Sequence, residues 1–264
     1  MYATNYHRAS SVDEAVKLLS GADEGKYVSG GMTLIATMKQ RLASPSDLVD
    51  LRHIPSLKGI RVDGRRVTIG AAATHAEVAS SAAIRAVCPA LCDLAGMIGD
   101  PHVRHMGTIG GSVANNDPAA DYPSAMLGLG ATIVTDKRQI TADDFFTGLF
   151  ETALEDGELI TAITFEAPEK AGYAKFPNPA SRYAMTGVFV AKGVGGVRVA
   201  VTGAGADGVF RHAGMEQALA ANWAPDAVAN ATVDSSALMS DLHATAEYRA
   251  NLIKVMAKRA VAAA

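Results

Sequence analysis

Two short glycine-rich segments carry the residue types best suited to holding a phosphorylated ligand. The first is Ser29–Thr33, with the sequence SGGMT, between a predicted short strand and a predicted helix. Paired glycines allow successive backbone N–H groups to point the same way, and they let a ligand approach the main chain closely. Together with a helix N-terminus they make an anion-binding loop, although an ordinary tight turn can have the same composition.

The second segment is Gly107–Ser112, with the sequence GTIGGS, and it is followed by Asn115, Asp117 and Asp121. It again pairs glycines with hydroxyl side chains. Its backbone amides could hold a diphosphate, and the two aspartates could accept hydrogen bonds from sugar or ribityl hydroxyls. The two segments together predict a ligand with two phosphates that is held from both sides. A purely structural glycine-rich turn is the competing interpretation.

A third glycine-rich segment, Gly203–Gly208, matches G-x-G-x-x-G but lacks the context of a dinucleotide-binding βαβ unit. That unit needs a helix that opens inside the motif, and an acidic residue at the end of a second strand about 20 residues later. Here Val209–His212 precede any helix, and Asp226 follows Pro225 in a loop-like stretch. We therefore do not expect a Rossmann fold.

Metal, cluster and nucleophile chemistry have no supporting pattern in this sequence. The two cysteines, Cys88 and Cys92, are too few for an iron–sulfur cluster or a cysteine-only zinc site, and they fit buried, reduced thiols. The seven histidines are scattered, with only His102 and His105 close together, and no H-E-x-x-H or G-x-S-x-G occurs. No catalytic acid, base or nucleophile stands out, which suits a protein that only positions a redox cofactor.

The composition is that of a folded protein with a sizeable core. Of the 264 residues, 49% are hydrophobic and 19% are charged, and the formal net charge is −3. The acidic balance argues against a nucleic-acid-binding protein. The longest central stretch without charged residues, Tyr122–Thr135, is too short to span a membrane. No secretory signal is visible at the N-terminus, so we expect a location in the cytoplasm or at the inner face of the membrane.

Hydrophobic periodicity predicts strands and helices in alternation up to about residue 165, and antiparallel strands and helices after a boundary near 166–172. A helix is expected after the capping box at Thr74–Glu77, and residues 99–121 are expected to form a long functional loop. The other expected helices are 12–19, 33–42, 83–97 (interrupted at Pro89), 215–221 and 244–262, and the expected strands are 26–28, 47–51, 66–70, 185–191 and 197–201.

These segments together resemble the FAD-binding medium subunit of the xanthine dehydrogenase / carbon monoxide dehydrogenase family of molybdenum hydroxylases, over nearly the whole chain. Ser29–Leu34 is similar to the family's first flavin pyrophosphate loop, A-G-G-x-[ST/D]-L. Val103–Ser112 resembles the signature V-R-N-x-[AG]-T-I-G-G-N, with His105 and Ser112 in place of the commoner asparagines. The shorter matches are Val49–Leu57, Ile69–His75 (I-G-A-x-x-T-[HL]), Asp117–Pro123 and Glu247–Arg249.

The resemblance implies an α+β fold in two domains. Residues 1–167 would form a PCMH-type FAD-binding domain with two subdomains, at about 1–57 and 58–167. Residues 168–264 would form a C-terminal flavoprotein domain, in which a three-stranded antiparallel sheet is combined with helices.

The resemblance also implies noncovalently bound FAD, with no catalytic residue and no metal ligand on this chain. Lys175 matches a lysine near the flavin, and Tyr183 lies where the family often has an aromatic residue near the isoalloxazine ring. The residues implied to contact the cofactor are Ser29, Gly30, Gly31, Met32, Thr33, Leu34, Thr74, His75, Ile98, Gly107, Thr108, Gly110, Gly111, Ser112, Asn115, Asp121, Ile160, Lys175 and Tyr183.

The family's subunits work with two partner chains, a large molybdopterin subunit and a small subunit with two [2Fe–2S] clusters, as a dimer of heterotrimers. The resemblance therefore implies an electron-transfer subunit that passes electrons from the clusters through FAD to an external acceptor. Molybdopterin and the clusters would reside only on the partners. The alternative is a free-standing FAD-dependent oxidoreductase of the same fold with its own organic substrate, which would need an acid or base over the flavin.

Overall fold

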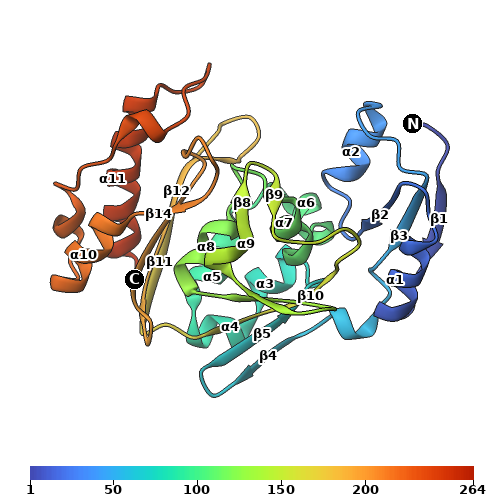
Figure 1. Cartoon of the computed structure of the whole chain (residues 1–264). Coiled ribbons are helices and arrows are strands. Elements are labelled where there is room, and N and C mark those ends of the chain that lie inside the picture. Colours follow the sequence, from blue (N-terminus) through green and yellow to red (C-terminus); the bar gives the residue numbers. More distant parts are fainter.

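The computed structural model describes all residues, 1–264, and arranges them in three units along the chain (Figure 1). The first unit is a parallel sheet of three strands in the order β1 (Asn5–Arg8), β3 (Asp47–Asp50), β2 (Gly25–Val28). Its helices are α1 (Val12–Ser20) and α2 (Leu34–Lys39). The Ser11 side chain caps α1 by accepting a hydrogen bond from the Glu14 amide, as its position before the apolar repeat predicts.

The second unit is built on an antiparallel sheet of five strands. Their order is β4 (Ile60–Asp63), β5 (Arg66–Gly70), β10 (Ile160–Glu166), β6 (Thr132–Thr135), β7 (Gln139–Thr141). The central strand β10 therefore lies between two strands that precede it by many residues. A small hairpin, β8 (Phe146–Gly148) and β9 (Glu151–Thr152), follows the short helix α9 (Ala142–Phe145).

Six helices connect β5 to β6 in this second unit. The capping box predicted at the start of α3 is present, with both reciprocal hydrogen bonds of Thr74 and Glu77. The helix expected at 83–97 is two helices that meet at Cys88, because Pro89 cannot continue the preceding helix. The six are α3 (His75–Ser80), α4 (Ala82–Val87), α5 (Pro89–Gly96), α6 (Pro101–Met106), α7 (Ile109–Asn115) and α8 (Tyr122–Leu129).

The segment 99–121, expected to be a long loop, is more regular than its composition suggests. Asp100 caps α6 and Thr108 caps α7, each by accepting from the amide three residues later. Gly107 separates the two short helices, and the left-handed residue Asn116 (φ 41°) ends the second. Gly107 and Asn116 thus mark helix boundaries, whereas Gly110 and Gly111 lie inside α7.

The third unit corrects one expectation about the C-terminal sheet. It has four antiparallel strands rather than three, in the order β11 (Lys170–Pro177), β12 (Ala184–Gly193), β13 (Gly196–Thr202), β14 (Phe210–Arg211). The added strand is only two residues long, and it forms because the Gly203–Gly208 loop returns the chain to pair with β13. The G-x-G-x-x-G segment is therefore a connection between two antiparallel strands.

Helices cover both faces of the C-terminal sheet. On one face lie α10 (Ala213–Ala221) and α11 (Ala246–Ala262), and on the other lie α5 and α8 of the second unit (Figure 1). Residues 122–128 of α8 are all buried. One core cluster of 31 buried residues accordingly runs from β5 through α8 to Phe189 on β12. The short 3-10 turns are Pro55–Leu57, Pro225–Val228 and Ser235–Ala237.

The Glu247–Arg249 motif holds α11 against this sheet. Arg249 is buried, and its Nη1 atom donates to the Met185 and Gly203 carbonyls at the neighbouring ends of β12 and β13. Its Nη2 atom forms an ion pair with Asp241 at 2.8 Å. No helix of the structure combines the length and the apolar character that crossing a membrane requires.

Candidate functional site

A cavity of about 630 Å³ lies between the first and second units, and the β11–β12 connection contributes to its wall. All the residues predicted to contact the cofactor line it, except Thr74 and Lys175. Those that line it are Ser29, Gly30, Gly31, Met32, Thr33, Leu34, His75, Ile98, Gly107, Thr108, Gly110, Gly111, Ser112, Asn115, Asp121, Ile160 and Tyr183. The two glycine-rich segments therefore face one cavity, as their composition predicts.

The first glycine-rich loop offers unused hydrogen-bond donors to this cavity. The backbone N–H groups of Gly30, Gly31, Met32 and Thr33 have no acceptor within the chain. Gly31 has a left-handed backbone (φ 69°), which turns the chain between β2 and α2 and favours glycine. Successive unpaired amides of this kind form a site for an anion.

Only glycine fits at position 30, because the two glycine-rich segments approach each other closely there. A Cβ atom on Gly30 would lie 2.3 Å from the Met106 carbonyl oxygen and 2.5 Å from the Gly107 Cα atom. The Thr108 hydroxyl also donates to the Ser29 hydroxyl at 3.0 Å. The first and second units are thus joined directly at the cavity wall.

The second segment differs from what its glycines suggest. The Ile109 and Gly110 amides donate to the Ala73 and Ala71 carbonyls at 3.0 and 2.9 Å. The Gly111 amide donates to the Thr108 hydroxyl at 3.2 Å. The expectation that this loop presents a row of free amides to a diphosphate is therefore wrong, because α7 uses them to dock on the segment after β5.

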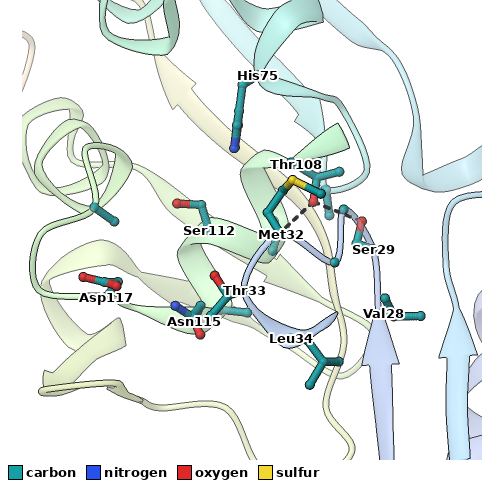
Figure 2. Close-up of a pocket in the computed structure, with 18 of the residues that line it drawn as sticks. Val28, Ser29, Met32, Thr33, Leu34, His75, Thr108, Ser112, Asn115 and Asp117 are labelled. Atoms are coloured by element: carbon teal, nitrogen blue, oxygen red, sulfur yellow. Dashed lines mark hydrogen bonds between the residues drawn. The ribbon is translucent and has the colours of Figure 1, made fainter. Parts of the chain in front are cut away.

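The packing of α7 on the segment after β5 also explains why residue 110 is a glycine. A Cβ atom there would lie 2.6–2.9 Å from three atoms of Ala71, two of which belong to the backbone. Gly110 therefore serves close packing of two backbones, whereas Ser112 and Asn115 of the same helix line the cavity. Figure 2 shows Ser112 and Asn115 directed into it, together with Thr33 from the opposite loop.

His75 is a buried titratable side chain that points into the cavity (Figure 2). It is the first residue of α3, is only 5% exposed, and has no hydrogen-bond partner at Nδ1. Burial, with a smaller contribution from the positive charge of Arg104, lowers the pKa of His75 to about 4. The imidazole is therefore neutral at pH 7. An unsatisfied buried nitrogen costs about 1–3 kcal/mol and calls for a partner.

Asp121 and Lys175 are placed differently from the predicted contacts with flavin. Lys175 lies outside the cavity wall and is buried, with Nζ 2.9 and 3.1 Å from the two Asp121 carboxylate oxygens. The Tyr173 hydroxyl also donates to Asp121, at 2.5 Å. The Asp121 carboxylate is thus engaged within the protein, and Lys175 additionally donates to the Met97 carbonyl at 3.0 Å.

Two further predicted residues have structural roles that their position explains. Thr74 caps α3 and lies outside the cavity wall. Asp117 lines the cavity, but its carboxylate accepts from the Ala119 amide at 2.9 Å and so closes a turn. Tyr183 lines the rim and is 44% exposed, beside the left-handed residue Arg182 (φ 64°).

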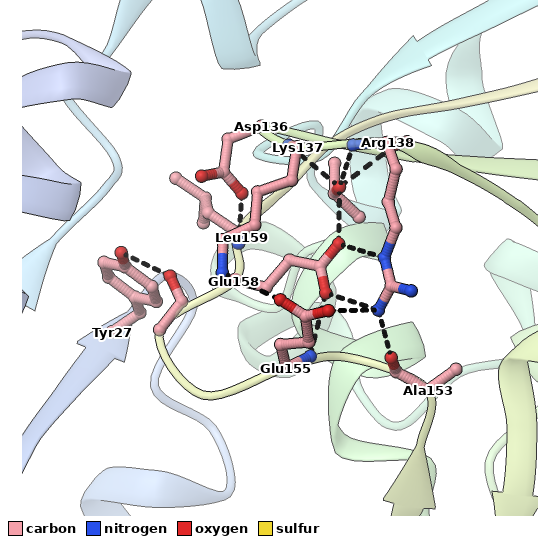
Figure 3. A network of polar contacts seen from close by, with 10 residues as sticks. Tyr27, Asp136, Lys137, Arg138, Ala153, Glu155, Glu158 and Leu159 are labelled. Carbon is pink, nitrogen blue, oxygen red and sulfur yellow. Dashed lines mark hydrogen bonds and ion pairs between the residues drawn. The ribbon is translucent and has the colours of Figure 1, made fainter.

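One wall of the cavity, the loop between β9 and β10, is not predicted by any pattern in the sequence. Its lining residues Leu154, Glu158 and Leu159 belong to no recognisable motif. Figure 3 shows how a polar network fixes this loop: the Arg138 guanidinium donates to both carboxylate oxygens of Glu158 at 3.0 and 2.9 Å. These hydrogen bonds lower the pKa of Glu158 to about 2.

The same loop contacts the first unit. The Tyr27 hydroxyl at the end of β2 donates to the Gly157 carbonyl at 3.1 Å (Figure 3). Burial raises the pKa of Tyr27 to about 12, so its hydroxyl keeps its proton. Asp136 accepts from the Leu159 amide at 2.7 Å. The β9–β10 loop thereby spans the two units that enclose the cavity.

Comparison with known proteins agrees with this geometry. Residues 2–167 match the family model described as the FAD binding domain in molybdopterin dehydrogenase. The chain belongs to the FAD-binding medium subunits of the xanthine dehydrogenase / carbon monoxide dehydrogenase family of molybdenum hydroxylases. It is an oxidoreductase flavoprotein subunit of that family.

Relatives of this medium subunit cover nearly the whole chain. It is 34% identical to the carbon monoxide dehydrogenase medium chain of Hydrogenophaga pseudoflava, over 98% of this chain and 96% of that one. It is 32% identical to the nicotine 6-hydroxylase medium subunit of Paenarthrobacter nicotinovorans, over 98% and 96%. The solved structure of reconstituted CO dehydrogenase from Oligotropha carboxidovorans superposes with a TM-score of 0.88 at 33% identity, covering 99% of this chain and 97% of that one.

Proposed function

We propose that this medium subunit carries FAD noncovalently in the cavity and transfers electrons within a heteromeric molybdenum hydroxylase. A small partner subunit with [2Fe–2S] clusters would supply the electrons, and an external acceptor would remove them. A large molybdopterin subunit would oxidise the substrate. Relatives described as medium chains or medium subunits support an assembly of several chains, and we propose a dimer of heterotrimers.

The observation that carries the proposal is the row of unpaired amides at Gly30–Thr33. Four successive N–H donors on a left-handed turn fit the diphosphate of a dinucleotide, and no lysine or arginine is needed to hold it. Tyr183 and the β9–β10 loop line the same cavity as this loop. A ligand with groups on both sides of its phosphates fits such a cavity.

The remaining wall residues position the two halves of the dinucleotide. Ser112 and Asn115 direct polar side chains to the cavity beside the amide row, where hydroxyl groups of the ligand would lie. Tyr183 at the exposed rim would cover the flavin ring on the acceptor side. When bound, FAD supplies an electron carrier that accepts one or two electrons.

The acidic side chains of the cavity support a transfer role rather than oxidation of an organic substrate on this chain. Asp117, Asp121 and Glu158 all line it, and each carboxylate is hydrogen-bonded within the protein. Asp121 and Glu158 are held by Lys175 and Arg138, so neither carboxylate is free to move a proton to or from a substrate. The two free cysteines are buried, which fits a reducing compartment, and we propose the cytoplasm or the inner face of the membrane.

The proposal is tested by purifying the chain, denaturing it and identifying the released flavin. We expect about one FAD per chain, all of it released, and negligible turnover of organic substrates until the two partner chains are added. FMN in place of FAD, flavin that stays with the precipitated protein, or rapid turnover by the isolated chain would contradict the proposal.

A pair of glycine variants tests the amide row itself. Gly31→Ala places a side chain at φ 69° in the cavity loop, whereas Gly64→Ala does so at φ 57° in the β4–β5 turn, far from the cavity residues. Both place a side chain on a left-handed backbone, and Gly31→Ala in addition brings its Cβ atom to 2.9 Å from Ile35 Cγ1, whereas nothing lies within 4 Å at Gly64. We expect FAD affinity to fall at least about tenfold in the first variant only. Equal affinities would show that this loop does not hold the cofactor.

A further inference from the structure

The turn between β8 and β9 (Figure 1) holds two large apolar side chains at the surface. Leu149 is 42% exposed and Phe150 is 58% exposed. They are the two residues of a tight turn, because Gly148 pairs with Glu151 across the hairpin. Phe150 has a left-handed backbone (φ 56°), which at the second position of such a turn is ordinarily given to glycine or asparagine. The chain therefore accepts backbone strain at the point where it exposes an aromatic ring.

One buried residue fixes this strained turn. Asn116 is 2% exposed, and its Nδ2 atom donates to the Gly148 and Glu151 carbonyls at 2.9 and 2.8 Å. Its own carbonyl accepts from the Phe150 amide at 3.2 Å. A side chain that is fixed before a partner arrives loses less conformational freedom on binding, so this arrangement favours a protein interface.

The turn lies beside the end of the cavity that Tyr183 lines. The residues before and after the buried asparagine, Asn115 and Asp117, both line the cavity. Two residues further on, Ala119 accepts from the Ala184 amide at 3.3 Å, which brings Tyr183 to the same region. A chain seated on the turn would therefore lie next to the part of the cavity where we place the flavin ring.

The exposed surface continues from the turn onto the third unit. Gly208 lies against the turn, since a Cβ atom there would lie 3.7 Å from the Gly148 carbonyl oxygen and 3.9 Å from Leu149 Cδ2. Gly208 also lines a groove of about 410 Å³, together with the apolar side chains of Phe210 and Leu238. The turn and the groove together offer a partner more contact area than either does alone.

Two exposed carboxylates flank this surface. Glu151 directly follows the turn, and Asp207 lines the groove. Neither forms an ion pair within the chain. Protein interfaces combine an apolar centre with a polar rim, and the charges across them are complementary. The partner that fits here therefore has an apolar pocket for Phe150 and basic residues around it.

We propose that the Leu149–Phe150 turn and the adjoining groove are the docking site of the electron-donating [2Fe–2S] subunit. This inference rests on the proposed function. The donor has to stay close to the flavin through every turnover, whereas the external acceptor binds only transiently, and permanent subunit contacts are the more apolar kind. A preformed apolar turn beside the flavin end of the cavity meets that requirement.

The test titrates the FAD-loaded chain with the [2Fe–2S] subunit and with the large subunit, each purified from the separated complex. We expect Phe150→Gly to bind the [2Fe–2S] subunit at least about tenfold more weakly than wild type, and the large subunit as wild type does. Leu242→Gly removes a 90% exposed leucine from the segment before α11. This control should bind both partners as wild type does.

Measurements on the chain alone distinguish an interface role from a structural one. Phe150→Gly should melt at the wild-type temperature or higher, because glycine relieves the left-handed strain, and it should bind FAD fully. Unchanged affinity for the [2Fe–2S] subunit, an equal loss in Leu242→Gly, a loss confined to the large subunit, or a lower melting temperature with loss of FAD would overturn the proposal. A wild-type chain that carries FAD but binds neither partner would instead refute the proposed function.

Discussion

Asp121 lies on the cavity wall, yet its carboxylate is bound by Lys175 and Tyr173 inside the protein. We expect Asp121→Ala to lower the free energy of unfolding of the flavin-free chain by about 3–5 kcal/mol, because it leaves the buried Lys175 ammonium without its counter-ion. Urea unfolding measures this directly. Any loss of FAD affinity would follow from movement of α8 and not from a lost ligand contact.

The double variant Asp121→Ala/Lys175→Met separates these two explanations. Removing both charges should restore at least about 1–2 kcal/mol of the stability that Asp121→Ala loses, since the unpaired charge has gone. The same pair should regain FAD affinity if Asp121 acts through the fold. Restored stability with FAD binding still absent would instead assign Asp121 a direct contact with the ligand.

The change of the free energy of unfolding with pH should include a contribution from His75. The unfolded imidazole takes up a proton near its ordinary pKa of 6.5, whereas the pKa of the folded one is about 4. The unfolded state therefore binds more protons between these values, and the free energy of unfolding falls as the pH drops through them, by about 3 kcal/mol in total.

Urea unfolding of the flavin-free protein at about pH 7 and about pH 4.5 measures this loss. In His75→Gln the loss should be smaller than in wild type by about 2–3 kcal/mol, because all other titrating groups are shared. The groups that face His75 from neighbouring helices are Arg104 and Tyr122, and neither changes its charge in this range. Identical pH dependences would mean that His75 is not buried as described.

At the scale of single residues, the sequence predicts where polar chemistry lies better than it predicts what each group does. Both glycine pairs reach the cavity, but only the first has free amides, because the Ala71 carbonyl and the Thr108 hydroxyl accept from the second. Ala71 is about 40 residues away from Gly110, and the local sequence does not show that these two segments will meet. Likewise, nothing near Asp121 in the sequence indicates that Tyr173 and Lys175 will bind it.

At the scale of elements, the β9–β10 loop depends on one buried ion pair. The Glu158 side chain is fully buried and that of Arg138 is 42% exposed. Arg138→Met should destabilise the chain, because it leaves the buried Glu158 carboxylate with only the Thr135 hydroxyl and the Glu155 amide as hydrogen-bond donors. It should also weaken FAD binding, since the loop lines the cavity.

The neighbouring residue provides a matched control. Lys137 is as exposed as Arg138 and pairs with the exposed Glu155 at 3.1 Å. Lys137→Met should therefore change the free energy of unfolding by less than about 1 kcal/mol and leave FAD affinity as it is. Similar effects of the two substitutions in urea unfolding would mean that the buried carboxylate does not depend on Arg138.

About half of the regular elements are predicted from local patterns; among the strands, β1, β4, β6 to β11 and β14 are not. The capping box at Thr74 and the break at Pro89 are decided by neighbouring residues, and both are present. The strand Phe210–Arg211 forms because it pairs with Val201 of β13, and the β9–β10 loop is held by Arg138. Neither partner is a close neighbour in the sequence. Local periodicity carries no information about those partners.

At the scale of the whole molecule, the proposed domains 1–167 and 168–264 share a core. Helix α8 is buried by the second unit on one side and by β12 and β13 on the other, and a Cβ atom on Gly128 would lie 2.6 Å from the Phe189 ring. A fragment of residues 1–167 would expose this face. We expect it to lack the cooperative thermal transition of the full chain and to retain no FAD.

Calorimetry compares the thermal transitions of the 1–167 fragment and the full-length chain, and the flavin released from each is measured as well. A fragment that melts cooperatively and carries FAD would show that the C-terminal sheet is dispensable. The complementary fragment, 168–264, retains its own cluster of 15 buried residues under α10 and α11.

The placement of β10 at the centre of the middle sheet has a consequence for how the chain is made. During synthesis β4, β5, β6 and β7 all emerge first, and β5 and β6 can be joined only when residues 160–166 arrive between them. Until then both strands present open edges to other nascent chains. Late closure by distant residues is slow, so production of this subunit should depend on chaperones and improve at low growth temperature.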